Sequence, residues 1–135
     1  MSVAIDKIRG ITRPLVETLR GVGIRNSEQL LEQAATPQLR KQLSEKTGTE
    51  PAVILHLANR ADLSRINGIG GVYSDLLEQA GVDTVKELAQ RRPDNLYRTM
   101  QDINDHRQLA KMLPSEDTVY SWVAQAKNMH KVLEY

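Results

Sequence analysis

The sequence repeats itself with an offset of 58 residues, and this internal repeat is the feature that most constrains the fold. With Ile8 placed on Ile66, the segment KIRGITRPLVETLRGVGI is aligned with RINGIGGVYSDLLEQAGV. The matched pairs are turn glycines, helix caps and apolar residues, namely Gly10/Gly68, Ile11/Ile69, Leu15/Tyr73, Leu19/Leu77, Gly23/Gly81, Ile24/Val82, Asn26/Thr84 and Leu30/Leu88. A shared backbone requires these residue types, so we interpret the chain as two tandem copies of one unit.

The repeat continues with less regularity toward the end of each copy. TEPAVILHLA resembles SEDTVYSWVA, which pairs Val53 with Val119, Leu57 with Val123 and Ala58 with Ala124. The second copy is longer by about eight residues between Met100 and Ser115. We therefore predict two pseudo-symmetric units, 1–61 and 62–135, packed as one globular domain.

The spacing of apolar residues predicts an all-α chain. Apolar side chains recur at i, i+3, i+4 and i+7, as in Tyr73, Leu76, Leu77 and Ala80. The same spacing runs from Val119 to Leu133, which predicts that the longest helix closes the chain. Thr84 and Glu87 have the spacing of a capping box, with Asn26 as a weaker cap, whereas no segment alternates with the period of a strand.

Composition excludes several classes of protein. No apolar run approaches the ~20 residues of a membrane span, so we expect no membrane association. The absence of cysteine removes disulfides, thiolate metal sites and thiol catalysis, and fits a cytoplasmic protein. The net charge of +1 is uneven, because residues 1–61 carry nine Lys/Arg against six Asp/Glu and residues 62–135 carry nine against eleven. Any polyanion should prefer the first copy.

The glycine-rich stretch before the stripe at Tyr73 predicts a tight turn between two helices. Gly68 and Gly70 supply the backbone freedom that such a turn needs, Ile69 is expected to fill its underside, and Gly71 follows. Consecutive N–H groups at such a turn, at the positive end of a helix, form a site that holds an anion without any side chain.

The segment LSRINGIGGVYSDLL resembles the helix-hairpin-helix motif, in which a Gly-hydrophobic-Gly turn joins two helices. The resemblance covers about twenty residues and is weaker in the first copy, where Thr12 replaces the second glycine. Over nearly its full length, the chain is similar to a tandem helix-hairpin-helix family catalogued only as a domain of unknown function. This likeness implies an all-α fold in which each copy opens with a hairpin. In helix-hairpin-helix proteins more widely, the turns hold DNA phosphates without reading sequence.

Carried onto this chain, the resemblance gives two groups of candidate nucleic-acid-binding residues. The second hairpin contributes Arg65, Gly68, Ile69, Gly70 and Gly71, and the first contributes Arg9, Gly10, Ile11, Thr12 and Arg13. The second copy has the glycines that the turn requires, whereas the first copy has more basic residues around its turn. The second turn is followed by Val72 and Tyr73 where DNA-binding hairpins often carry Lys or Arg, so its nearest cation is Arg65.

We therefore predict a non-catalytic domain that contacts the DNA backbone and uses no cofactor or metal. The first alternative is a protein-protein interaction or self-association module whose hairpins are purely structural. The second alternative is a lyase or glycosylase of the DNA-repair type, which would need a desolvated lysine. No lysine stands out for that role, and the three histidines, His56, His106 and His130, match no metal-binding spacing. Tyr73 and Trp122 are expected in the core.

Overall fold

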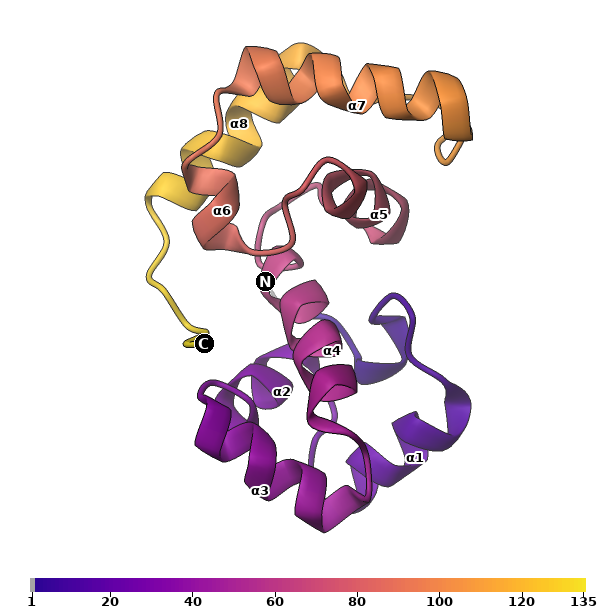
Figure 1. Ribbon diagram of the computed structural model, residues 1–135, viewed down its shortest axis with the longest axis vertical. Coiled ribbons are helices and arrows are strands. Elements are labelled where there is room, and N and C mark those ends of the chain that lie inside the picture. The colour runs from indigo at the N-terminus through magenta and orange to yellow at the C-terminus, as the bar shows by residue number, and fades with distance from the viewer. Residues whose placement is uncertain (1) are drawn as a thin grey trace. The chain divides into compact units, whose positions relative to one another are not determined.

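The computed structural model describes residues 2–135 and confirms the all-α prediction. Within those residues it contains eight α-helices and one short 3₁₀ helix, η1 (Ile5–Lys7), and no strand (Figure 1). The one extended pairing among them is an isolated antiparallel bridge between Ala4 and Asn26. It ties η1 to the start of the second helix.

The described chain divides into two compact units. Unit 1 contains the residues up to Arg65 together with Lys131–Tyr135, and unit 2 contains Ile66–His130. The boundary lies four residues beyond position 61, because Asp62, Leu63, Ser64 and Arg65 stay with the first unit. The last five residues return to unit 1, which the internal repeat gave no reason to expect.

Unit 1 is built around a central helix that packs on two others. Its helices are α1 (Arg13–Gly21), α2 (Ser27–Gln33), α3 (Pro37–Thr47) and α4 (Pro51–Leu63). The fourth helix packs against α2 and α3, and its buried face includes Ile54, Leu57 and Ala61. The spacing of these three residues puts them on one side of the helix, which is why the helix buries one face.

Unit 2 contains α5 (Gly71–Gln79), α6 (Val85–Ala89), α7 (Pro93–Arg107) and α8 (Glu116–Lys127). The last of these packs against α6 and α7, and α5 packs against α7. Trp122 of α8 is 1% exposed and forms a tilted ring contact with Tyr73, at 5.5 Å between centroids. Trp122 is thus in the core as expected, while Tyr73 is only half-buried.

Side-chain caps start the helices at the positions that the sequence indicated. The Asn26 side chain accepts a hydrogen bond from the N–H of Gln29 at 2.8 Å, and Thr84 Oγ1 accepts from the N–H of Glu87 at 3.2 Å. Each satisfies one of the N–H groups that a helix start leaves without an intrahelical partner. The first turns of α2 and α6 therefore need no external acceptor at those donors.

The end of the chain differs from the expected long final helix. α8 ends at Lys127, and α7, with 15 residues, is the longest helix in the described chain. Leu133 is buried in the core of unit 1 instead of continuing the apolar stripe of α8. Apolar spacing alone cannot distinguish a helix that continues from an extended segment that buries the same residues against another part of the chain.

The expected pairing of the last helices of the two copies is also wrong by one residue. Val53 is 43% exposed whereas Val119 is fully buried, so these two positions are not equivalent. Burial instead pairs Ile54 with Val119 and Leu57 with Trp122. A shift of one residue turns a helix by about 100°, which moves a side chain from the core to the surface.

Candidate nucleic-acid interface

The turn before α5, where the sequence predicted the second hairpin, depends on Gly68, which has a φ of +97°. A Cβ atom built on Gly68 would lie 3.1 Å from Nε1 of Trp122, in addition to the strain that a side chain suffers at this φ. The turn is also held from α8 by Gln125, whose Oε1 accepts a hydrogen bond from the N–H of Asn67 at 3.0 Å. The second turn is therefore a supported and well-defined structure.

Ile69 supports the turn but offers no donor at its main chain. Its side chain is 8% exposed, and its N–H donates to the carbonyl oxygen of Ile66 at 3.3 Å. The N–H of Asn67 is engaged by Gln125, so two of the N–H groups in this stretch already have acceptors within the protein. The donors left for a ligand lie further along, at the start of α5.

The start of α5 carries the N–H donors nearest to this turn. Gly70 is the N-cap residue and has no side chain to accept a hydrogen bond. The N–H groups of Gly71, Val72 and Tyr73 have no main-chain acceptor among the described residues either. Three donors therefore point out of the positive end of a nine-residue helix, an arrangement that suits an anion.

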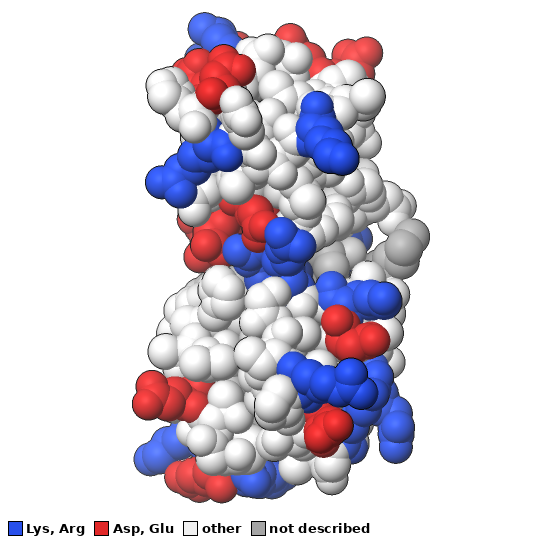
Figure 2. All heavy atoms as spheres, turned by 90° about the vertical axis from the view of Figure 1, so that its right-hand side faces the viewer, with Lys and Arg blue, Asp and Glu red and all other residues white. Residues whose placement is uncertain are grey.

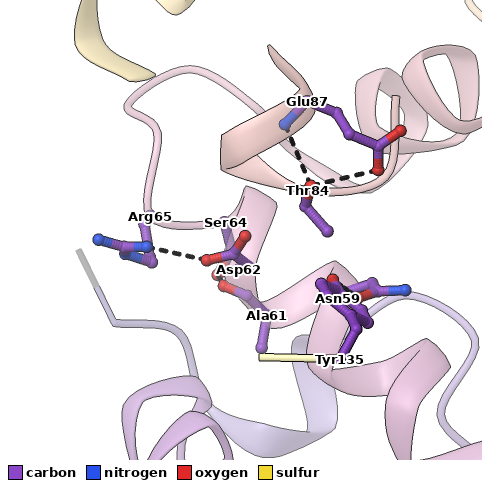
Figure 3. Close-up of polar contacts among 8 residues, drawn as sticks. All are labelled: Asn59, Ala61, Asp62, Ser64, Arg65, Thr84, Glu87 and Tyr135. Carbon is purple, nitrogen blue, oxygen red and sulfur yellow. Dashed lines mark hydrogen bonds and ion pairs between the residues drawn. The ribbon is translucent and has the colours of Figure 1, made fainter. Parts of the chain in front are cut away.

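Arg65, the cation expected beside this turn, is engaged elsewhere. Its Nη1 lies 2.9 Å from Oδ1 of Asp62, and the side chains of Arg65 and Asp62 are 18% and 5% exposed (Figure 3). Arg65 also lines a hollow of about 440 Å³ in unit 1 together with Glu28 and Glu32. Its charge is thus shared with a carboxylate within the protein.

The turn before α1, where the sequence predicted the first hairpin, has a similar backbone but fewer donors. Gly10 has a φ of +87°, and the N–H of Ile11 donates to the carbonyl oxygen of Ile8 at 3.2 Å. Thr12 is the N-cap residue of α1, yet its side chain forms no capping hydrogen bond. Pro14 in the first turn of α1 has no N–H, which removes one of the donors that α5 retains.

The cations near the first turn are exposed but have acidic neighbours. Arg9 and Arg13 are both exposed. A hollow of about 380 Å³ beside this turn is lined by Asp6, Ile11, Arg13, Val16, Glu17 and Arg20. On the face shown in Figure 2, basic and acidic side chains alternate over both units, with no broad patch of either sign. That face therefore offers a polyanion no broad positive surface.

Sequence reasoning missed one neighbour of α5, the loop between α7 and α8. The hydroxyl of Tyr73, in the first turn of α5, donates to the carbonyl oxygen of Met112 at 3.0 Å. This bond ties the loop to the side chain of Tyr73. The extra length of the second copy was visible in the sequence, but no local pattern indicated where that loop would lie.

The geometry defines an all-α protein with two glycine turns, each placed at the start of a helix. The chain belongs to the family described as Domain of unknown function (DUF4332), whose model matches residues 9–129. No curated protein and no solved structure matches the chain.

Within residues 2–135, no helix has both the length and the apolar character needed to cross a membrane. Among the same residues, no group of three or more His, Asp and Glu side chains is arranged to hold a metal ion.

Proposed function

We propose that this protein is a non-catalytic binding domain that contacts the phosphate backbone of nucleic acid, DNA in the first instance, without reading base sequence. The contacts are made by the main-chain N–H groups at the start of α5, with a weaker contact at the turn around Gly10. Arg9 and Arg13 add positive charge at the weaker turn. Such contacts position a protein on a duplex but specify no base.

We further propose that the two units are tandem copies of one pseudo-symmetric fold, each opening with a helix-hairpin-helix. Matched backbone geometry supports this proposal. Gly23 and Gly81 both have a φ of +88° at the ends of α1 and α5. The N–H of Ile24 donates to the carbonyl oxygen of Leu19 at 2.9 Å, and the equivalent bond from Val82 to Leu77 is 2.8 Å.

The observation that carries the proposed function is the glycine cap of α5. Four other helices in the described chain begin with a side chain that accepts from their first turn, namely Asn26, Thr36, Thr84 and Ser115. Gly70 lacks such a side chain, although its backbone is extended, with φ −94° and ψ −171°, and a Cβ there would meet nothing within 4 Å. Nothing in the local structure prevents a capping residue at Gly70, so the first N–H groups of α5 are open to an external acceptor; α1, α4 and α7 also lack a side-chain cap, but each has a proline in its first turn and so one donor fewer.

The direct test is a fluorescence-anisotropy titration of a labelled duplex of arbitrary sequence at two salt concentrations. For about two to four phosphate contacts, the affinity should fall roughly ten- to hundred-fold between about 50 and 200 mM salt. A second duplex of unrelated sequence should bind equally well. Absence of binding at the lower salt concentration would contradict the proposal.

Substitutions of Gly70 test the site itself. Gly70→Asp and Gly70→Asn each introduce a side-chain acceptor for the first turn of α5, with and without charge. In each variant the new side chain would accept from an N–H group that otherwise donates to a phosphate. Both variants should therefore weaken duplex binding by about tenfold or more, the effect of losing one charge-assisted hydrogen bond. Gly70→Ala is the matched control, because it adds a Cβ but no acceptor and should bind like the wild type. A folded Gly70→Asp protein with unchanged affinity would refute the site.

The second candidate function is a protein-protein interaction module, which would include self-association. The mixed charge of Figure 2 and six large apolar side chains that are more than one-third exposed favour it, namely Val53, Val72, Leu109, Met112, Tyr120 and Tyr135. Sedimentation at increasing protein concentration tests self-association. A concentration-dependent mass, combined with no duplex binding, would favour this alternative over nucleic acid.

An enzymatic role has the least support. Lys86, Lys111 and Lys127 are all exposed, whereas a catalytic lysine is activated by desolvation in a pocket. A cytoplasmic location remains a prediction from the cysteine-free composition.

A further inference from the structure

Residues 131–135 belong to unit 1, although they have no regular secondary structure. Leu133 is 3% exposed and is part of the hydrophobic core of unit 1, and Val132 packs against the same core. The N–H of Glu134 donates to the carbonyl oxygen of Ala35 at 2.7 Å. The segment is thus held as a bound peptide is held, by main-chain hydrogen bonds together with a side chain buried in its receptor.

Two side chains of unit 1 recognise the end of this segment. Arg40 of α3, 5% exposed, donates to the carbonyl oxygen of Glu134 at 2.7 Å, and its guanidinium carbon lies 5.8 Å from the ring centroid of Tyr135. Asn59 of α4 accepts from the hydroxyl of Tyr135 at 2.8 Å (Figure 3). We call Ala35, Arg40 and Asn59 the docking surface. Without an occupant, the buried guanidinium would lose one of its two carbonyl acceptors, which is unfavourable.

The chain between α8 and this segment has only a weak signal for the end of a helix. Residues 128–135 contain neither glycine nor proline, and Asn128 at the C-cap has a φ of −99°, which any residue adopts. Met129 and Leu133 continue the apolar spacing of α8. The helix nevertheless ends at Lys127. The turn that follows α8 is therefore imposed by the docking of the segment on unit 1 more than by the local sequence.

The sequence thus supports two conformations of residues 128–130, which form the hinge. In the observed conformation the chain turns there, and the segment docks on unit 1 of its own chain. In the other, α8 continues through the hinge. The hinge then becomes shorter and points along α8, because a helix rises about 1.5 Å per residue whereas an extended chain spans about 3.3 Å. That change of length and direction takes the segment off its own docking surface.

We propose that residues 131–135 exchange between two copies of this chain, so that each segment binds the docking surface of the other copy and α8 continues through the hinge. A second copy supplies the buried leucine, the carbonyl acceptor and the tyrosine hydroxyl that the docking surface requires, because its segment has the same sequence. Reciprocal exchange restores every docking contact and makes a dimer. The inference is independent of the proposed function, because the docking surface includes neither glycine turn.

The main test mixes two single-cysteine variants, because the chain has no cysteine of its own. Glu134→Cys, at an exposed position, is incubated with Ala35→Cys at high protein concentration and then oxidised. The hydrogen bond of 2.7 Å between these two residues brings their main chains within reach of a disulfide. Exchange predicts a mixed disulfide between the two chains. Lys41→Cys, on the exposed side of α3, replaces Ala35→Cys in the control and should give several-fold less.

The hinge gives a second test at one exposed position. Asn128→Ala favours a continued helix and Asn128→Gly opposes it, while both remove the same side-chain hydrogen bond to the carbonyl oxygen of Ala124. The two residues differ by about fivefold in helix propensity, and the hinge occurs twice in the dimer. The association constant measured by sedimentation should therefore be roughly twentyfold higher for Asn128→Ala than for Asn128→Gly.

Each outcome supports or overturns the inference. A mass of one chain at every concentration would overturn it. A dimer that gives no more mixed disulfide with Ala35→Cys than with Lys41→Cys would show that another surface associates, and the inference would be wrong. Equal association constants for the two Asn128 variants would refute the helical hinge. Failure to bind any duplex would contradict the proposed function and leave this inference in place.

Discussion

At the scale of single residues, the glycines of the turn before α5 have different roles. Gly68 is required by the fold, because its φ is +97° and a Cβ would press on Trp122 at 3.1 Å. Gly70 is under neither constraint, since its φ is −94° and the space around it is open. A glycine that the backbone does not require is the stronger indication of function.

This difference gives a prediction about stability. Gly68→Ala should lower the free energy of unfolding by about 1–3 kcal/mol, because it combines left-handed strain with a close contact. Gly70→Ala should change it by less than about 0.5 kcal/mol, because the smaller entropy of the unfolded chain offsets a poorer N-cap. Urea denaturation followed by the fluorescence of Trp122, the single tryptophan, measures both. Equal effects of the two substitutions would contradict the assignment.

At the scale of elements, the cap of α6 contains an unfavourable pair of charges. Thr84 Oγ1 accepts from the N–H of Glu87 and donates to Glu87 Oε1, each at 3.2 Å (Figure 3). A side-chain hydrogen bond with Asp83 raises the pKa of Glu87, and burial and the charge of Asp83 act in the same direction. This bond requires a proton between the two carboxyl groups, and when both groups are ionised their charges repel at the start of this short helix.

A dependence of stability on pH follows from this pair. The pKa of Glu87 is raised in the folded state. The contribution of Glu87 to the free energy of unfolding is therefore fully present below the ordinary pKa of a glutamate, and it is lost as the pH rises through the pKa that Glu87 has in the folded protein. Asp83→Asn should therefore stabilise the protein at about pH 7, and the gain should shrink or reverse near pH 4. Denaturation at the two pH values tests this, with Asp102→Asn on the exposed face of α7 as the control. A gain that is independent of pH would rule out the carboxylate pair as its cause.

At the scale of the whole molecule, the chain passes between its two units twice, after Arg65 and again after His130. The second passage ends in a segment that is bound firmly to unit 1. Arg40, 5% exposed, donates to the carbonyl oxygens of Ala34 at 2.8 Å and Glu134 at 2.7 Å. The hydroxyl of Tyr135 donates to Asn59 at 2.8 Å (Figure 3). One buried arginine thus attaches the last residues to the first unit.

Removal of this arginine should release the segment. Arg40→Met keeps most of the apolar volume but leaves two carbonyl oxygens without their donor, which predicts a loss of about 2–4 kcal/mol in unfolding free energy. Trypsin should then cleave faster after Lys131, an exposed residue of the released segment. Lys41→Met, on the exposed side of the same helix, is the control. An unchanged cleavage rate would show that other contacts hold the segment.

The sequence by itself determined the features that depend on local chemistry. Apolar spacing predicted the helices, and Asn26 and Thr84 were recognised as caps because a cap acts within three residues of its own position. The turn glycines were found because Gly10 and Gly68 recur at equivalent places, and both have a positive φ. These features need no knowledge of what packs against them.

Tertiary structure decided the features that join distant parts of the chain. Arg65 looked like the cation of the second turn until Asp62 was seen to pair with it. Leu133 fitted the stripe of α8 but is buried in unit 1, and Met112 carried no signal until Tyr73 was found to hold it beside α5. Helical periodicity and capping are set by neighbours in sequence, whereas the partner of a charge or an apolar side chain is set by distance in space. For that reason the sequence identified the turn, and only the fold showed which donors it leaves free.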